Sequence, residues 1–293
     1  MLVKSLIPKV AAIHDLSGFG RCSLTVIIPV LSAMGIQACP LPTAILSTHS
    51  GGFDGFVFHD LTQIMEPYGI HWMDQNIEFD CLYSGFLGSE EQIDHMLNLF
   101  KYLKTKDEQL VVVDPVMADN GVLYKTYNIE MQKGMALLVK KADVITPNLT
   151  EAYFLLNRPY INKPLDDERI KELLKSLSDI GPETVVITSL ETTDGCNVNV
   201  GYNKTEDLYW KVAYDHVPVS YPGTGDIFTS VLIGGLLDGN SLPLAMDRAT
   251  QFVSLAVRTT FEYGGVKREG VLLERVLPWL INELTHNSYT TIS

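Results

Sequence analysis

Short apolar runs rich in β-branched residues alternate along the chain with longer segments that have helical spacing. Residues 110–113 and 185–187 are apolar at every position, which is typical of strands covered on both faces of a parallel sheet. The pattern predicts strands at 10–14, 37–41, 81–85, 110–114, 144–146 and 184–188, and helices at 23–34, 89–104, 129–140, 150–157 and 167–178.

The pattern changes near residue 195. Residues 197–202 and 208–212 alternate on either side of a turn, which predicts an antiparallel hairpin at a sheet edge. Helices are expected at 224–237, 241–260 and 271–284, and a polar tail at about 285–293 is expected to fray. No repeat or linker divides the chain, so residues 1–293 are predicted to form a single α/β domain with helices on both faces of a mainly parallel sheet.

Composition limits the partners of this chain. Its 293 residues are 46% hydrophobic and 19% charged, which is typical of a folded protein. The net charge of -13 disfavours nucleic acid and anionic membranes. No apolar run reaches the roughly 18 residues of a spanning helix, and four widely spaced cysteines lack zinc-site spacing. We therefore expect a cytoplasmic protein. If it binds a phosphorylated small molecule, a local feature such as backbone amides or a metal ion must offset the negative charge.

The strongest chemical signal is a glycine-rich turn at Gly223, Thr224 and Gly225, directly before an amphipathic helix. Glycines let backbone N–H groups point toward one spot, and the helix N-terminus adds positive potential there. Asp226 lies in the first turn of this helix. From the residues alone, it is either a functional carboxylate or an ordinary acid that complements the helix dipole.

Polar residues also follow two of the predicted strands. Asp114 ends the run at 110–113, and Thr146, Asn148 and Glu151 follow the next strand. Carboxyl ends of strands are where open α/β sheets bind ligands, and oxygen ligands of this kind suit Mg²⁺. The alternatives are a turn-initiating Asp before Pro115 and an ordinary helix start with Glu151 in its first turn.

The Gly-x-Gly-Asp at 223–226 resembles the signature of the ribokinase superfamily. The resemblance implies a ribokinase-like α/β/α fold and phosphoryl transfer from ATP to an alcohol. Asp226 would be the catalytic base, with the amides of Gly223, Thr224 and Gly225 around the transferred group. At a positive helix end we expect Asp226 to stay ionised and therefore to be a weak base.

Asp-Pro-Val-Met at 114–117 and Thr-Pro-Asn-x-x-Glu at 146–151 resemble the two motifs of the vitamin kinase branch, which holds pyridoxal kinases and hydroxymethylpyrimidine kinases. Thr188 and Ser189 match a Thr-Ser of animal-type pyridoxal kinases. The resemblance implies Mg²⁺ held by Asp114 and Glu151. It implies an ATP site made of Asp114, Asp119, Thr146, Asn148, Glu151, Thr188 and Ser189.

Residues 83–89 and 46–50 resemble vitamin-binding segments of pyridoxal kinases. This resemblance implies that Ser50 and His49 contact the vitamin and that Phe86 is an aromatic wall, although His49 also fits a buried imidazole with satisfied hydrogen bonds. Asp15 occupies the position at which pyridoxal kinases carry a substrate-contacting Ser. An Asp at this position is closer to the pattern of hydroxymethylpyrimidine kinases. A carboxylate there gains most from a protonated amine, which favours pyridoxamine as a substrate.

The resemblance implies a homodimeric pyridoxal-type kinase that phosphorylates the 5'-hydroxymethyl group of a B6 vitamer. A requirement for a monovalent cation such as K⁺ stays open. One alternative is a hydroxymethylpyrimidine kinase, and another is a non-catalytic vitamin or nucleotide sensor. A sugar kinase is disfavoured, because Ser220 and Tyr221 replace its usual Asp-Thr. The chain also lacks the G-x-x-x-x-G-K-[ST] sequence of P-loop kinases.

Overall fold

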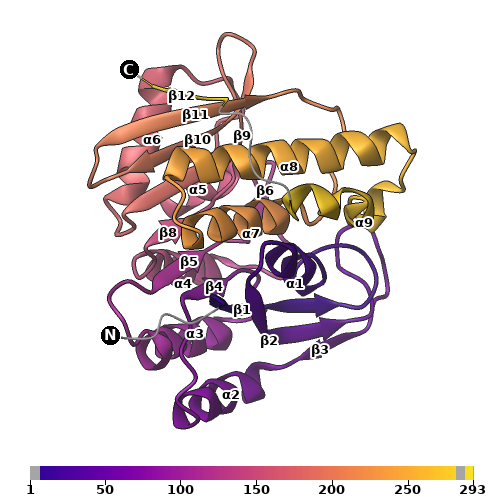
Figure 1. Cartoon of the computed structure of the whole chain (residues 1–293), viewed down its shortest axis with the longest axis vertical. Helices are drawn as coiled ribbons and strands as arrows, with labels where there is room; N and C mark the ends of the chain where they lie inside the picture. Colours follow the sequence, from indigo (N-terminus) through magenta and orange to yellow (C-terminus); the bar gives the residue numbers. More distant parts are fainter. Residues whose placement is uncertain (1–6, 282–287, 293) are drawn as a thin grey trace.

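The central feature of the fold is a ten-stranded sheet (Figure 1). The computed structural model describes residues 7–281 and 288–292. The strand order is β12-β11-β10-β9-β8-β5-β4-β1-β2-β3. The strands are β1 Lys9–Ser17, β2 Gln37–Leu46, β3 Phe58–Asp60, β4 Cys81–Ser84, β5 Leu110–Val113, β8 Val144–Ile145, β9 Thr184–Glu191, β10 Asn197–Asn203, β11 Leu208–Tyr214 and β12 Tyr289–Thr291.

The middle of the sheet is parallel. Strands β2, β1, β4, β5, β8 and β9 pair in parallel, whereas β3 on one side and β10, β11 and β12 on the other pair antiparallel. In β5, Val111 and Val113 belong to the hydrophobic core on one face and Val112 to the core on the other. The uninterrupted apolar runs of the sequence therefore have the predicted cause, and both the α/β class and the β10–β11 hairpin are confirmed.

Two sets of helices cover the sheet. One core contains residues from α2 Thr62–Asp74, α3 Glu90–Leu103, α4 Ile129–Val139, α5 Leu149–Leu155 and α6 Asp167–Ser178. The other contains residues from α1 Leu24–Ala33, α7 Thr224–Leu237, α8 Leu242–Glu262 and α9 Leu273–Val276. Figure 1 shows α1, α7 and α8 over the near face of the sheet. Even α8, with 21 residues, is unsuited to crossing a bilayer, and no other helix within residues 7–281 and 288–292 is suited to it.

No helix or strand was predicted between residues 54 and 80, where the structure has β3 and α2. Pro67 and Gly69 lie inside α2 and lower its intrinsic helix propensity. Packing supplies what propensity lacks, because a Cβ at Gly69 would lie 2.1 Å from a methyl carbon of Leu99 on α3. The small hairpin of β6 Ala118–Asp119 and β7 Val122–Leu123 was not predicted either.

The helix expected at 271–284 is wrong as a continuous α-helix. The structure has the short α9, followed by a 3₁₀ turn at Leu277–Ile281. Pro278 lies in that turn, and a proline cannot donate the backbone hydrogen bond that an α-helix needs there. Residues 282–284 lie outside the described residues.

The prediction that the tail frays is wrong for residues 289–291. Residues Tyr289–Thr291 form β12 and pair with β11 in the register Val212 to Tyr289. The strand is fixed on both sides, because Ile292 is buried and the Ser288 N–H donates to Asp247 on α8 at 2.9 Å. The outer edge of β11 therefore gains a partner that the polar composition of the tail did not indicate. Residues 285–287 and 293 lie outside the described residues.

Candidate active site

The carboxyl ends of the parallel strands place most of the candidate residues at one edge of the sheet. Asp15 lies near the end of β1, Asp114 directly follows β5, and Thr146 directly follows β8. The N-terminus of α7 lies at the same edge, because the Ser23 N–H before α1 donates to Asp226 at 2.8 Å. A ligand site at the carboxyl ends of the strands was expected from the positions of Asp114 and Thr146 after two predicted strands. The Ser23 contact joins the start of α7 to this edge.

The turn before α7 requires glycine at residue 223. Gly223 is the helix N-cap with a φ of 82°, in the left-handed region that favours glycine. A Cβ here would lie 2.1 Å from the carbonyl oxygen of Arg21, so the chain before α1 packs directly on this turn. The N–H groups of Thr224, Gly225 and Asp226 lie in the first helical turn, where no intrahelical acceptor is available. The turn is therefore suited to an anionic group.

Asp226 is a largely buried carboxylate, with 13% of its side chain exposed. Its Oδ2 accepts the Ser23 N–H, and its Oδ1 lies 4.0 Å from Nδ1 of His14. Burial raises the pKa of Asp226 to about 7, and the nearby Asp15 charge adds to the shift. The expectation of a weak base is therefore corrected, because burial makes the Asp226 carboxylate a stronger base than an exposed Asp.

Asp15 is joined to Asp226 through Ser23. The Ser23 hydroxyl donates to Oδ1 of Asp15 at 2.6 Å, and the Ser17 hydroxyl donates to Oδ2 at 3.1 Å. Asp15 is buried, and burial raises its pKa despite these two hydrogen bonds. Ser23 thus touches one carboxylate with its backbone and the other with its side chain.

Asp114 lies next to the glycine turn. A Cβ on Gly225 would lie 3.9 Å from its Oδ2. Burial and the charges of Glu151 and Asp226 raise the pKa of Asp114 well above its usual range. No ion pair within residues 7–281 and 288–292 involves Asp114 or Glu151. A buried carboxylate that lacks a cationic partner is suited to a bound cation.

Glu151 and Asn148 form a capping box at the start of α5. The two oxygens of Glu151 accept the N–H groups of Met117 at 3.1 Å and Asn148 at 2.9 Å, while the Asn148 amide donates to the Ala118 carbonyl at 2.8 Å. Burial raises the pKa of Glu151 to about 8. The helix-start interpretation of Glu151 is thus confirmed, and its ligand role stays a prediction.

Metal ligands are few in this region. Among the residues that the structure describes, no three His, Cys, Asp or Glu side chains are grouped closely enough to hold a metal ion by themselves. Mg²⁺ is usually bound through one or two carboxylates together with waters and substrate phosphates. The donor set of Asp114 with Glu151 nearby fits that mode of binding and does not fit a cage made only of protein.

The remaining nucleotide candidates extend this edge toward β10. Thr146 accepts a hydrogen bond at 2.9 Å from Thr229 of α7, and Thr188 pairs with Asn148 across the sheet. Ser189 has a φ of 60°, and its N–H donates to Asn199, whose amide donates to Thr250 of α8. Thr250 also lines a cavity of about 690 Å³ with Tyr214, Gln251, Arg258 and Trp279.

Asp119 lies in the β6–β7 hairpin, close enough to Glu151 for the two charges to interact. It is exposed, and its carboxylate accepts the backbone N–H and the side-chain amide of Asn120 at 2.9 and 3.0 Å. These bonds close the turn between β6 and β7. The structure therefore gives Asp119 a local partner, and its nucleotide contact stays a prediction.

The predicted vitamin contacts lie on the loop after β2 and on the segment after β4. His49 is buried, and its ring nitrogens lie 2.6 Å from the Arg268 carbonyl and 3.0 Å from the Gly51 N–H. The alternative of an imidazole with satisfied hydrogen bonds therefore describes His49. Ser50 is exposed, and Phe86 is half-buried against the ring of Tyr127.

Two residues at the centre of the site were missed by sequence reasoning. Ser23 was predicted only as the start of the helix at 23–34 and His14 only as the end of the strand at 10–14, yet both lie against Asp226. Ser23 and Asp226 are 203 residues apart, and no local pattern encodes a contact over that separation. The signal that was available is their position just before a predicted helix and at the end of a predicted strand.

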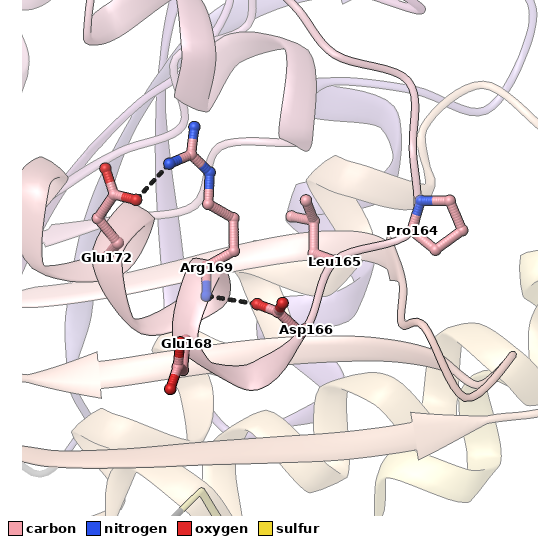
Figure 2. Close-up of a pocket in the computed structure, with 6 residues that line it drawn as sticks. All are labelled: Pro164, Leu165, Asp166, Glu168, Arg169 and Glu172. Carbon is pink, nitrogen blue, oxygen red and sulfur yellow. Dashed lines mark hydrogen bonds and ion pairs between the residues drawn. The ribbon is translucent and has the colours of Figure 1, made fainter.

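A second hollow, of about 480 Å³, lies at the start of α6 (Figure 2). Figure 2 shows two local contacts there: the backbone N–H of Arg169 donates to the Asp166 carboxylate at 2.8 Å, and the Arg169 guanidinium pairs with Glu172. None of the candidate site residues lines it. We therefore do not assign this hollow as the candidate active site.

Comparisons with known proteins identify relatives of this chain. A family model described as phosphomethylpyrimidine kinase matches residues 28–270. The pyridoxal kinase of Arabidopsis thaliana is 30% identical over 241 residues, which cover 78% of this chain and 72% of that protein.

Solved structures give the same answer. A Bacteroides thetaiotaomicron protein described as a phosphomethylpyrimidine kinase, crystallised with pyridoxal, has a TM-score of 0.93 and 48% identity, covering 98% of this chain and 100% of that one. The pyridoxal kinase of Lactobacillus plantarum has a TM-score of 0.85 and 30% identity, with coverage of 94% and 97%. The chain belongs to the phosphomethylpyrimidine kinase family and, within it, to the pyridoxal kinases of the ribokinase superfamily.

Proposed function

We propose that this protein transfers the γ-phosphoryl group of ATP to the 5'-hydroxymethyl group of a B6 vitamer. The observation that carries the proposal is the meeting of Asp226, the Gly223 turn and Asp114 at one edge of the sheet. The similarity to pyridoxal kinases and to a pyridoxal-bound relative supports the same reaction. The family model's own description makes hydroxymethylpyrimidine the second candidate substrate, and Asp15 is the residue that favours it.

Asp226 is the base in this proposal. The vitamin oxygen forms a bond to the γ-phosphorus while the bond from that phosphorus to the bridging oxygen of ADP breaks, and the hydroxyl proton passes to Asp226. The transition state is loose, so most of the acceleration comes from positioning and from stabilising charge. The N–H groups of Thr224 and Gly225 face the anion for this purpose, and Ser23 holds the base in place.

Magnesium would be held by Asp114 together with the nucleotide phosphates and, through water, by Glu151. Each oxygen of Glu151 already accepts backbone N–H groups, which favours an indirect contact. The ion would supply positive charge to the phosphates and relieve the repulsion between these buried carboxylates. A monovalent cation remains an expectation from the family resemblance.

ATP would lie along the edge from the Gly223 turn toward α8. Thr146 is hydrogen-bonded to α7, and Asn148 pairs with Thr188 across the sheet. Ser189 is linked to Thr250 through Asn199. Thr250 lines the cavity of about 690 Å³, which is large enough for a nucleoside. We propose that the phosphates contact the first group and that the nucleoside enters this cavity.

The direct test is an ADP-release assay with Mg²⁺-ATP and each candidate alcohol. We expect turnover with pyridoxal, pyridoxine and pyridoxamine that exceeds turnover with hydroxymethylpyrimidine or sugars. Faster turnover of hydroxymethylpyrimidine would assign the protein to thiamine synthesis. If no alcohol is turned over, the result favours the alternative of a non-catalytic vitamin or nucleotide sensor.

The same assay tests the expected role of Asp15. If its buried carboxylate faces the vitamin, the protonated amine of pyridoxamine gains a charge-assisted hydrogen bond that the aldehyde of pyridoxal cannot make. We expect kcat/KM for pyridoxamine to equal or exceed the value for pyridoxal. A result in which pyridoxamine is the poorest of the three vitamers would contradict this role.

The pH dependence of kcat/KM follows from the environment of Asp226. Burial raises its pKa to about 7, and only the ionised carboxylate can accept the proton. We expect kcat/KM to rise about tenfold per pH unit below about pH 7 and to level off above it. Steady-state rates between about pH 5.5 and 8.5 check this. A flat profile would show that a group with this pKa is not required.

Assembly as a homodimer remains a proposal. Strand β3 is an end strand of the sheet, with Phe58 40% exposed. Val57, Ile45 and Ile64 on adjacent segments are exposed as well. An edge strand with apolar neighbours is a surface that a second copy can cover.

A cytoplasmic location is proposed on the state of the cysteines. Cys22, Cys39, Cys81 and Cys196 are all free. Unpaired thiols are typical of a reducing compartment.

A further inference from the structure

We propose that His14 is a positioning residue for phosphoryl transfer, whose imidazole donates from Nδ1 to Oδ1 of Asp226 and so fixes the direction in which the base faces the substrate. The inference rests on the proposed role of Asp226 and adds to it a residue that never touches the substrate. His14 has no exposed surface, so it can act on the reaction only through its neighbours.

The first observation is an unused donor directed at the base. Nδ1 of His14 lies 4.0 Å from Oδ1 of Asp226, slightly too far for a hydrogen bond. Within the described part of the chain, neither ring nitrogen of His14 has a hydrogen-bond partner. A buried polar group without a partner is costly, and a small rotation of the Asp226 side chain gives Nδ1 its acceptor.

The second observation is that the ring is held in place by its surroundings. A Cβ on Gly85 would lie 2.2 Å from Nδ1 of His14, so the backbone just after β4 packs directly on the imidazole. The ring of Tyr83 lies edge-on to it at 4.2 Å between centroids. His14 therefore has little freedom to move, whereas Asp226 lies at the start of a helix and can turn toward it. The preformed partner is the histidine.

The third observation is that, among the described residues, the two carboxylate oxygens of Asp226 have one hydrogen-bond donor between them. Oδ2 accepts the Ser23 N–H at 2.8 Å, which leaves Oδ1 free to rotate about that bond. The other titratable groups around Asp226 include the carboxyls of Asp15 and Asp114, which add negative charge and repel it. A donor on Oδ1 would fix both ends of the carboxylate and leave the remaining lone pairs for the substrate hydroxyl.

The imidazole is suited to donate because it is neutral. Burial lowers the pKa of His14 to about 3, so it carries one ring proton at neutral pH. A full positive charge next to Asp226 would make its carboxylate a weaker base. A neutral imidazole can donate a hydrogen bond to the carboxylate and lowers its basicity less.

The test compares His14→Leu with His14→Asn, because the Asn amide nitrogen lies close to where Nδ1 stood. Loss of one hydrogen bond to a charged group predicts a fall in kcat of about 10- to 100-fold for His14→Leu. We expect the vitamin KM to stay within about twofold, and His14→Asn to recover most of the lost kcat. His95→Leu on α3 is the matched control, the same substitution outside the site, and it keeps the wild-type kcat.

A double-mutant cycle separates positioning from general damage to the fold. If His14 acts through Asp226, adding His14→Leu to Asp226→Asn lowers kcat no further, whereas independent structural damage multiplies the two losses. Multiplying losses, or an unchanged kcat in His14→Leu, would overturn the inference. If Asp226→Asn alone keeps full activity, the proposed function fails instead, so the two failures are distinguishable.

Thermal unfolding and binding of a non-hydrolysable ATP analogue identify variants that are merely misfolded.

Tyr83 is the rival donor, because its buried hydroxyl also lacks a hydrogen-bond partner within the described residues. Tyr83→Phe keeps the ring against His14 and removes that hydroxyl. We expect its kcat to stay near that of the wild type. A loss in Tyr83→Phe that is non-additive with Asp226→Asn would assign the positioning role to Tyr83.

Discussion

Replacing Asp226 with Asn lowers kcat by about 10²- to 10⁴-fold, while binding of an ATP analogue is retained. The amide keeps the shape of the side chain and can still accept the Ser23 N–H, so the start of α7 is preserved. What is lost is the ability to accept the substrate proton. Steady-state kinetics give the loss in kcat, and calorimetric titration with a non-hydrolysable ATP analogue gives the retained binding.

Asp167→Asn is the matched control for this variant. Asp167 also lies in the first turn of a helix, α6, and pairs with Lys211 at 3.0 Å outside the candidate site. We expect its kcat to be unchanged, since it shares the helix position of Asp226 and not its surroundings. Near-normal turnover of Asp226→Asn would refute the assigned role. An equal loss in both variants would show that the effect comes from helix starts in general.

Gly223→Ala combines backbone strain with a steric clash and is expected to impair both folding and activity. Alanine at a φ of 82° costs about 1–3 kcal/mol in conformational strain. Its Cβ would also lie 2.1 Å from the Arg21 carbonyl oxygen, which belongs to backbone that cannot rotate away like a side chain. Relief of that clash moves the chain that carries Ser23, and a displacement of about 1 Å at a catalytic group costs about 10²-fold in rate.

Gly239→Ala separates the two causes. Gly239 has a φ of 87°, but a Cβ there meets no atom within 4 Å. We expect this control to lose some thermal stability and to keep the kcat of the wild type. Chemical unfolding gives the free energy of unfolding for both variants, and the ADP-release assay gives the rates. If Gly223→Ala has the same rate as Gly239→Ala, the close contact with Arg21 has no role in catalysis.

The core of the fold was predictable because the apolar pattern of each central strand indicates which of its faces are buried. Residues 110–113 are apolar throughout, and the structure buries Val112 on one face of the sheet and its neighbours on the other. The elements that were missed lack such a local signature. Helix α2 contains a proline and a glycine, and β12 lies in a polar tail, so both depend on partners that are distant in sequence.

The candidate site shows the same division. Asp114, Thr146, Asn148 and Asp226 were placed at one edge because parallel strands and a helix start have a fixed direction. The links between these residues were not predictable. Ser23 reaches Asp226 over 203 positions, and no local spacing reports such a contact.

Hydrophobic period and backbone freedom are local properties, so the parallel sheet and the glycine turn before α7 could be predicted from the residues alone. The ionisation of the candidate site depends on tertiary packing. Asp226 lies at a positive helix end, which predicts an ionised carboxylate, yet burial raises its pKa to about 7. Desolvation depends on everything packed around a group, and in this site those neighbours come from strands and loops that are far apart in the chain.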